Sequence, residues 1–300
     1  MPRRKTLQLL LAGIGCIGAA AHAQTVVRSD ERLAADRPEA WAMNYFTAAS
    51  LMTGFGPTPT LLSGQWSVAA EIGHVPRLSE RQEQVGLGGF KQEDLNKSPV
   101  FGRVRGMLGL PDGWMVELGY TPPLEIDGAR PRDLFAAAIG RRVFSRGDVS
   151  ASARLFGQHG QGGGDITCPA ELAGVEDPGR NPYDCRAASD DRLRMNYYGL
   201  ELTLGLRRGE WQWHAGMAAV RTETEVQVDA YTNDVHDRSR LVAKDVLPTV
   251  AIGVNRRSGR YWHWGTEVLY VPLQVKRDTD RARESDPLIS LRMHLRYGAD

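Results

Sequence analysis

The sequence predicts an all-β fold: a ten-stranded antiparallel transmembrane β-barrel with a short N-terminal helical or plug segment. From Gln65 onward, apolar and polar residues alternate with the two-residue period of strands that bury one face. Short connections such as Pro111-Asp112-Gly113 alternate with long polar stretches such as His159–Asp191. Tight turns at one end and long loops at the other are typical of a membrane-spanning barrel.

The composition argues against two other classes of protein. The chain has 300 residues, a formal net charge of +1 and a mean hydropathy of −0.36. A helical membrane protein needs apolar runs of about 20 residues, and the only long run, Leu7–Ala21, is shorter. A net charge this small gives no reason to expect nucleic acid as a partner.

The chain divides into three predicted parts. Residues 1–23 read as a signal peptide, because a basic start and an apolar run precede the small-residue cleavage site Ala21-His22-Ala23. Residues 24–64 form the helical or plug segment, which does not follow the strand rhythm. Residues 65–300 form the barrel.

A helix is expected within residues 24–64. It begins near Pro38, since proline is favoured in the first turn. Apolar residues then recur at near-helical spacing, namely Trp41, Tyr45, Ala48 and Met52. Gly54 and Gly56-Pro57 end the pattern. A strand over Trp41–Thr53 is the competing interpretation. The segment lies either inside the barrel as a hatch or in the periplasm against the barrel base.

The ten predicted strands follow in order. They span Trp66–Ile72, Val100–Leu108, Trp114–Tyr120, Leu134–Phe144, Val149–Leu155, Tyr198–Leu204, Trp211–Met217, Val246–Val254, Trp262–Tyr270 and Ile289–Tyr297. The fourth is apolar on both faces, so its facing stays open. In the seventh the alternation slips near Ala219, which indicates a bulge or the point where the strand leaves the membrane.

Aromatic residues on the apolar face distinguish a membrane barrel from a soluble sandwich. They form a predicted girdle of Trp66, Trp114, Trp211, Trp213, Trp262, Trp264 and Tyr297. Six of these are tryptophans at the start of strands that leave a short turn. Indole prefers the membrane–water interface, because its ring is apolar and its N–H needs a partner.

The opposite face carries charged and polar residues that would line the lumen. The predicted network comprises Glu71, Arg103, Arg105, Glu117, Arg154, Glu201, His214, His263, Glu267, Arg292, His294 and Arg296. No sandwich core accepts such groups unpaired. Two interpretations stay open: a paired polar core that fills a small barrel, or a narrow path for small polar solutes lined by charge.

Cys168 and Cys185 are the only cysteines after the predicted cleavage site, and both lie in one long polar stretch. An even number of cysteines in an exported chain predicts a disulfide. No histidine stands near them, so they offer too few ligands for a metal site.

The last strand, Ile289–Tyr297, resembles the closing strand of bacterial outer-membrane β-barrel proteins, which usually ends on an aromatic residue. Here Gly298-Ala299-Asp300 follow Tyr297, which departs from that pattern. The resemblance covers about residues 65–300 and concerns the architectural class. It implies location in the bacterial outer membrane, contact with outer-membrane lipid and lipopolysaccharide, and insertion by the barrel-assembly machinery. No cofactor is expected from the sequence.

The pair Asp234-Val235-His236, in a long loop, resembles the Asp–His pair of the omptin outer-membrane proteases. The resemblance implies that Asp234 and His236 would activate a water molecule. The second acidic pair of omptins has no counterpart, since Asp190-Asp191 is contiguous and lies in another loop.

The favoured function is therefore a non-enzymatic membrane protein that passes or binds small solutes through a narrow charged lumen. The alternative is a surface-loop interaction or adhesion protein with a sealed polar core. An omptin-like protease is the least favoured.

Overall fold

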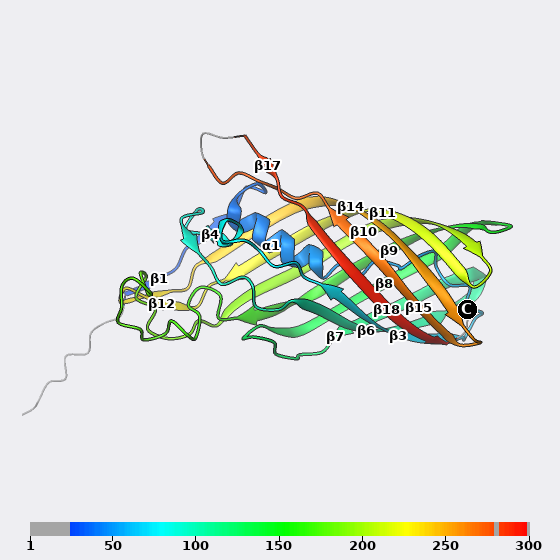
Figure 1. The fold of residues 1–300 in the computed structure, drawn as a ribbon, viewed down its shortest axis with the longest axis horizontal. Helices are drawn as coiled ribbons and strands as arrows, with labels where there is room; N and C mark the ends of the chain where they lie inside the picture. The colour runs from blue at the N-terminus through cyan, green and yellow to red at the C-terminus, as the bar shows by residue number, and fades with distance from the viewer. Residues whose placement is uncertain (1–24, 279–281, 299–300) are drawn as a thin grey trace, which may run out of the picture.

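Ten antiparallel strands close into one barrel, which confirms the predicted fold class (Figure 1). The computed structural model describes residues 25–278 and 282–298, so the predicted signal peptide, residues 1–23, lies outside the described residues. The barrel strands are β3 (Trp66–His74), β6 (Val100–Gly109), β7 (Trp114–Thr121), β8 (Arg130–Arg146), β9 (Val149–Gly164), β10 (Asp191–Arg208), β11 (Trp211–Gln227), β14 (Arg240–Ser258), β15 (Trp262–Val271) and β18 (Leu288–Gly298). Each pairs with the next along the chain, and β18 pairs with β3 to close the sheet.

The barrel exterior is apolar because side chains alternate across each strand. On β18, Ile289 and Leu291 are each about half exposed, whereas the intervening Ser290 and Arg292 are buried in the interior. A continuous apolar belt around a closed barrel is the surface that faces lipid in membrane barrels. The protein is an integral β-barrel of the bacterial outer membrane, where barrels with an even number of strands are the rule.

The two ends of the barrel differ. At the short-turn end, tight turns join the strands, and the first of these contains η1 (Pro111–Gly113). The long-loop end carries the remaining elements: β1 (Thr25–Val27), β2 (Asp30–Arg32), α2 (Glu80–Glu83), β4 (Gln84–Gly86), β5 (Lys91–Gln92), β12 (Ala230–Thr232), β13 (Val235–Asp237), β16 (Gln274–Val275) and β17 (Glu284–Ser285). Figure 1 shows these elements away from the C-terminus, which lies at the short-turn end.

The sequence did not show which side of β8 points into the barrel, but the burial of its side chains does. Leu134, Ala136 and Ala138 lie in the interior, whereas Phe135 and Ile139 are about half exposed on the exterior. Both faces are apolar because the interior side of β8 packs against the chain inside the barrel, where Ala136 and Ala138 join the main apolar cluster.

Of the two explanations for the slipped alternation in β11, the bulge is wrong. The strand pairs with β10 and β14 without a register shift from Trp211 to Gln227. The alternation looks broken near Ala219 because the apolar face of the strand changes there from the exterior to the interior. Val220 is buried in an apolar part of the interior, and the exterior becomes charged at Arg221, followed by Glu223. This change marks where the strand leaves the apolar belt.

The predicted helix is α1 (Pro38–Ala49), with Pro38 in its first turn, so the competing strand over Trp41–Thr53 is wrong. The helix packs against interior side chains of the long-loop half, and Trp41 and Tyr45 share one apolar cluster with Val220 of β11 and Leu269 of β15. α1 therefore lies inside the barrel, enclosed by its wall, and not in the periplasm against the barrel base. No helix among the described residues is long and apolar enough to cross a membrane.

Candidate functional site

Residues 49–61, which we call the plug, leave α1 and run through the lumen toward the short-turn end. Near α1, the carbonyl oxygen of Ser50 accepts a hydrogen bond from Arg103 of β6 at 2.7 Å. Midway, the Gly54 N–H donates to Glu201 of β10 at 3.0 Å. At the far end, the Thr58 N–H donates to the Ser152 hydroxyl of β9 at 3.1 Å. The plug thus contacts the barrel wall from the end of α1 toward the short-turn end of the lumen.

The plug is uncharged, although the lumen is not. Between Glu39 and Glu71 the chain contains no Asp, Glu, Lys, Arg or His. Four successive plug carbonyls instead accept hydrogen bonds from arginines of the barrel: Ala49 from Arg292 (2.8 Å), Ser50 from Arg103 (2.7 Å), Leu51 from Arg292 (2.5 Å) and Met52 from Arg154 (2.7 Å). The plug therefore binds the guanidinium groups of the lumen through its main-chain oxygens, without charged side chains of its own.

These contacts lie where α1 ends. The last carbonyls of a helix lack intrahelical donors and carry partial negative charge. α1 has no basic residue in its own last turn, so arginines from β6, β9 and β18 supply the positive charge. A hydrogen bond to a charged group contributes about 1.5–3 kcal/mol, so this set holds the plug firmly in the lumen.

A chain of buried ion pairs lines the wall beside the plug. Its N···O distances are 3.0 Å for Arg103–Glu71, 2.7 Å for Arg105–Glu71, 2.7 Å for Arg154–Glu117 and 2.9 Å for Arg154–Glu201, and Arg105 also pairs with Glu117. Three arginines thus face three glutamates. Because all six side chains are buried, losing one partner would leave an uncompensated charge and cost about 3–5 kcal/mol.

The other predicted lumen residues lie around the plug and below it. Glu267 accepts a hydrogen bond from the Thr53 hydroxyl at 2.5 Å and lies 3.3 Å from Nε2 of His214. The His294 ring packs edge-on against Phe55, with centroids 4.4 Å apart. His263 and Arg296 line a hollow at the short-turn end. All of the predicted lumen residues face the interior.

Three further interior residues contact the plug and were not predicted. Gln158 donates to the Ser50 hydroxyl at 2.8 Å, the Tyr197 hydroxyl accepts from the Met52 N–H at 2.8 Å, and Arg142 donates to the Thr58 carbonyl at 2.9 Å. The alternation along β9 alone would predict that Gln158 faces the lumen, because it lies on the same face of the strand as Arg154. Arg142 was hidden because β8 is apolar on both faces.

The predicted girdle residues lie on the barrel exterior near the short-turn end. Trp66, Trp213 and Trp262 are about half exposed, and Trp114, Trp211, Trp264 and Tyr297 are less so. The guanidinium of Arg141 lies 5.7 Å from the ring centre of Trp114, and that of Arg256 lies 5.1 Å from the ring of Trp211. Arginine over indole places a cation beside the apolar belt, where it can reach headgroups.

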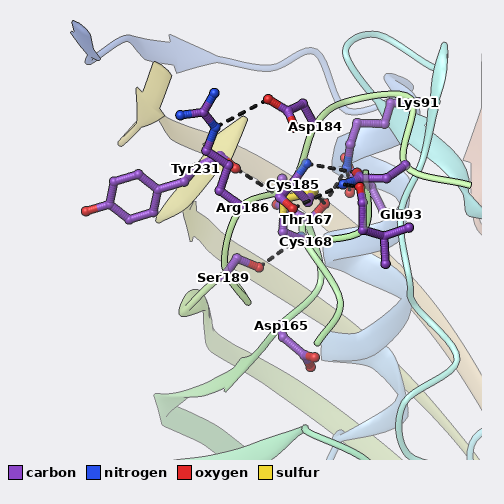
Figure 2. The surroundings of a disulfide bond; sticks show 12 residues. Lys91, Glu93, Asp165, Thr167, Cys168, Asp184, Cys185, Arg186, Ser189 and Tyr231 are labelled. Carbon is purple, nitrogen blue, oxygen red and sulfur yellow. Dashed lines mark hydrogen bonds and ion pairs between the residues drawn. A yellow bond between two sulfur atoms is a disulfide. The ribbon is translucent and has the colours of Figure 1, made fainter. Parts of the chain in front are cut away.

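The predicted disulfide between Cys168 and Cys185 is confirmed, with Cα atoms 5.6 Å apart (Figure 2). On one side, Lys91 donates to the carbonyl of Thr167, next to Cys168, at 2.7 Å. On the other, the Arg186 N–H donates to the carbonyl of Tyr231 in β12 at 3.1 Å. Together with these hydrogen bonds, the disulfide holds the loops that carry Lys91, Cys168, Cys185 and Tyr231 together at the long-loop end. We call these loops the cap.

The pairing of Asp234 with His236 that the omptin resemblance implied is wrong. Asp234 occupies the turn between β12 and β13 with a φ of 63°, and it pairs with Arg186 at 2.5 Å. His236 instead contacts Asp229 at 2.6 Å and stacks on the Tyr231 ring, with centroids 4.1 Å apart. Asp234 lies in the turn and His236 lies in β13, so the sequence spacing did not bring the two groups together.

In the part of the chain that the structure describes, no group of three or more His, Cys, Asp or Glu side chains could hold a metal ion. The polar groups of the lumen contact the plug, one another or the hollow at the short-turn end. The arrangement can thus hold a polypeptide segment in the lumen and present cations beside it.

No protein-family model and no curated protein match the chain. Solved structures that resemble it include the attachment invasion locus protein Ail of Yersinia pestis (8% identity over 79% of this chain and 98% of that one, TM-score 0.31). An outer membrane channel from Pseudomonas putida F1 gives 11% identity, coverage of 83% and 100%, and a TM-score of 0.36. The outer membrane protease OmpT from Escherichia coli gives 12%, 78% and 94%, and 0.29. Likenesses this low carry no argument about activity.

Proposed function

We propose that this outer-membrane barrel is a gated channel for small polar solutes, with residues 49–61 as a removable plug. The observation that carries the proposal is the set of hydrogen bonds from Arg103, Arg154 and Arg292 to four successive plug carbonyls. Arg103 and Arg154 also keep carboxylate partners in the wall, so their bonds to the displaceable plug main chain can be exchanged without leaving either charge unpaired.

The uncharged character of the plug supports its removal. When it leaves, no ion pair of the chain from Arg103 to Glu201 is broken, because all those pairs lie within the barrel wall. The guanidinium groups that lose plug carbonyls can take water or solute oxygens in exchange. The cost of opening is thus set by the plug contacts and by the apolar packing of α1, and not by the barrel.

A reversible crosslink tests the proposal. A Cβ built at Gly140 of β8 would lie 3.0 Å from Oγ1 of Thr58, which is close to the spacing of a Cβ and the partner sulfur in a disulfide. The double variant Thr58→Cys/Gly140→Cys would join plug and wall. In planar bilayers we expect oxidation to abolish the rare openings of the channel and reduction to restore them.

The single variants Thr58→Cys and Gly140→Cys are the matched controls, because neither can form the crosslink. Openings that persist in the oxidised double variant would show that solutes do not pass where the plug lies. The native pair Cys168–Cys185 lies at the opposite end of the barrel, so its reduction is monitored in the same controls.

One observation favours a second candidate, a surface-loop interaction protein with a sealed core. β1 adds in parallel to β13, and the disulfide ties the neighbouring loop to β12, so the long-loop end presents an ordered surface. This candidate predicts no conductance in any plug variant whose barrel remains folded.

A further inference from the structure

Three arginines contact aromatic rings on the outside of the barrel at the short-turn end. The pairs, with the distance from guanidinium carbon to ring centre, are Arg141 and Trp114 (5.7 Å), Arg256 and Trp211 (5.1 Å), and Arg260 and Tyr261 (5.2 Å). All six side chains are exposed, and we call them the collar. An arginine held in this way keeps its stem on the apolar surface and its charge at the boundary between lipid and water.

The register of the sheet builds two of these contacts. Trp114 and Arg141 are direct partners on β7 and β8. Arg256 of β14 has Trp211 of β11 as its partner on one side and Trp264 of β15 on the other. The rings of these two tryptophans meet edge to face, with centroids 5.6 Å apart. Because cross-strand partners share one face of a sheet, Arg256 and the two indoles form a single outward-facing cluster.

The collar arginines form no ion pair with any residue in the ranges 25–278 and 282–298, although carboxylates lie in the same turns. Glu210 acts on Arg256 only over a longer distance, because its two oxygens accept hydrogen bonds from Arg257 at 2.8 and 3.1 Å. Asp148 pairs with Arg208 at 3.5 Å. Each collar guanidinium therefore contacts an aromatic ring and keeps N–H donors for an anion from outside the chain.

The barrel exterior is different where the strands extend toward the long loops. Lys244 pairs there with Glu223 of the neighbouring strand at 2.8 Å. Arg194 and Arg240 both pair with Glu225, at 3.3 and 2.6 Å. These basic side chains are neutralised by carboxylates of adjacent strands, whereas those of the collar are not. The difference indicates that the two ends of the apolar belt meet different surroundings, and that the surroundings of the collar supply negative charge.

From these contacts we infer that the collar binds the phosphodiester group of glycerophospholipids and prefers lipids with a net negative charge. The short turns of such barrels lie on the periplasmic side, where the leaflet consists of glycerophospholipids. A guanidinium donates two parallel hydrogen bonds to phosphate oxygens, and indole occupies the boundary between headgroup and acyl chain. The turns at 145–148, 207–210 and 256–260 contain six arginines and two carboxylates, which favours anionic lipid. The inference is independent of any passage of solutes through the lumen.

The test is quenching of tryptophan fluorescence in vesicles of phosphatidylcholine that contain increasing fractions of brominated phosphatidylglycerol. Six of the seven tryptophans lie in the girdle, so quenching reports lipids at this end of the full-length barrel. We expect phosphatidylglycerol to bind about fivefold more tightly than phosphatidylcholine, with a preference that shrinks as salt concentration rises. Equal affinities would show only an apolar lipid shell and would overturn the inference. Loss of the preference in about 10 mM inorganic phosphate at constant ionic strength would indicate a site for free phosphate, and would also overturn it.

The two ends of the barrel supply matched variants with the same change in net charge. The variant Arg141→Gln/Arg256→Gln/Arg260→Gln should lose the preference for phosphatidylglycerol and keep the heat-modifiable gel mobility of a folded barrel.

The control Arg194→Gln/Arg240→Gln/Lys244→Gln, at the long-loop end, should keep the preference. An equal loss in this control would show an effect of net charge and would overturn the inference. The variant Arg141→Lys/Arg256→Lys/Arg260→Lys should keep only part of the preference, because lysine lacks the planar fork. A preference equal to that of the unaltered barrel would show that charge alone suffices, which would overturn the phosphodiester site.

Discussion

Arg292, on the last strand of the barrel, donates through one guanidinium to the carbonyl oxygens of Ala49 at 2.8 Å and of Leu51 at 2.5 Å. These residues are separated by more than 200 positions in the chain. The contact joins the closing strand, which seals the barrel, to the segment that occupies it. Closure of the sheet and seating of the plug are therefore structurally connected.

Replacing Arg292 by Lys should loosen the plug and spare the barrel. Lysine keeps the positive charge but lacks the planar fork that serves two carbonyls at once. Loss of one charge-assisted bond corresponds to about 1.5–3 kcal/mol. Hydrogen exchange at the Gly54 N–H should become faster by at least about tenfold. Arg194→Lys, on the exposed side of β10, is the control. If the Gly54 N–H exchanged equally slowly in both variants, the role given to Arg292 would be refuted.

The packing of α1 should hold the plug independently of the arginines. Trp41 is 1% exposed in the main apolar cluster, and its indole N–H donates to the carbonyl of Asp286 at 3.0 Å. Trp41→Ala should cost about 3–5 kcal/mol of helix docking. Limited proteolysis should then cut within residues 38–61 first. The lipid-facing variant Trp213→Ala should show no such cleavage, and cleavage in both would mean that the barrel itself had loosened.

Removing the disulfide should affect only the long-loop end. The bridge closes a stretch of 17 residues, a constraint worth about 3 kcal/mol in the chain-entropy model. The variant Cys168→Ser/Cys185→Ser should be cleaved by protease within residues 169–184 while its gel mobility stays that of a folded barrel. Unfolding of the barrel at a lower temperature would contradict the separation of cap and barrel.

The cap should be less stable at high pH because of Glu93. Burial raises the pKa of this carboxyl to about 7, from an ordinary value of 4.5, although its ion pair with Lys91 acts in the opposite direction. The folded cap therefore binds a proton more tightly than the unfolded chain does. Stability is fully present below pH 4.5 and is lost as pH rises through 7.

Hydrogen exchange of residues 83–95 should accordingly be faster at pH 8 than at pH 5, after correction for intrinsic exchange rates. Glu93→Gln should flatten this dependence, because the amide does not titrate. A variant with an unchanged pH profile would exclude Glu93 as its source.

The orientation of the barrel follows from the same topology. The loops spanning residues 77–98, 159–191, 229–240 and 275–285 are expected outside the cell. Phe90→Cys, at a side chain 86% exposed in the first of these loops, should react with an impermeant thiol reagent on intact cells. Ser258→Cys, at the end of β14 beside a short turn, should react only after the outer membrane is broken. The reverse pattern would invert the orientation.

Much of this architecture could be predicted because each strand carries its own signal. The alternation of apolar and polar residues predicted that Arg103, Arg105 and Glu117 face the interior, because the face that a strand residue takes can be read from its near neighbours in the sequence. The start of α1 was also readable, at Pro38. The helix could not be placed inside or outside the barrel from spacing, because that depends on partners such as Val220 and Leu269, far along the chain.

The plug contacts were beyond sequence reasoning for a related reason. They join main-chain carbonyls to side chains from three different strands, and a carbonyl has no sequence signature. One clue was present, however. The absence of charge between Glu39 and Glu71 sets this segment apart from the rest of the chain. An uncharged segment beside a predicted charged lumen is compatible with occupation of that lumen.

The conductance of the barrel with and without its N-terminal segment tests the central claim most directly. In planar bilayers the intact protein should show small or no steady conductance. Deletion of residues 24–64 should raise it and favour anions, because Arg103, Arg154 and Arg292 lose the carbonyls that they contact. Glu201→Gln should likewise raise conductance and alter ion preference, since it leaves Arg154 with one carboxylate partner fewer. A folded barrel whose conductance is unchanged by either alteration would contradict the account.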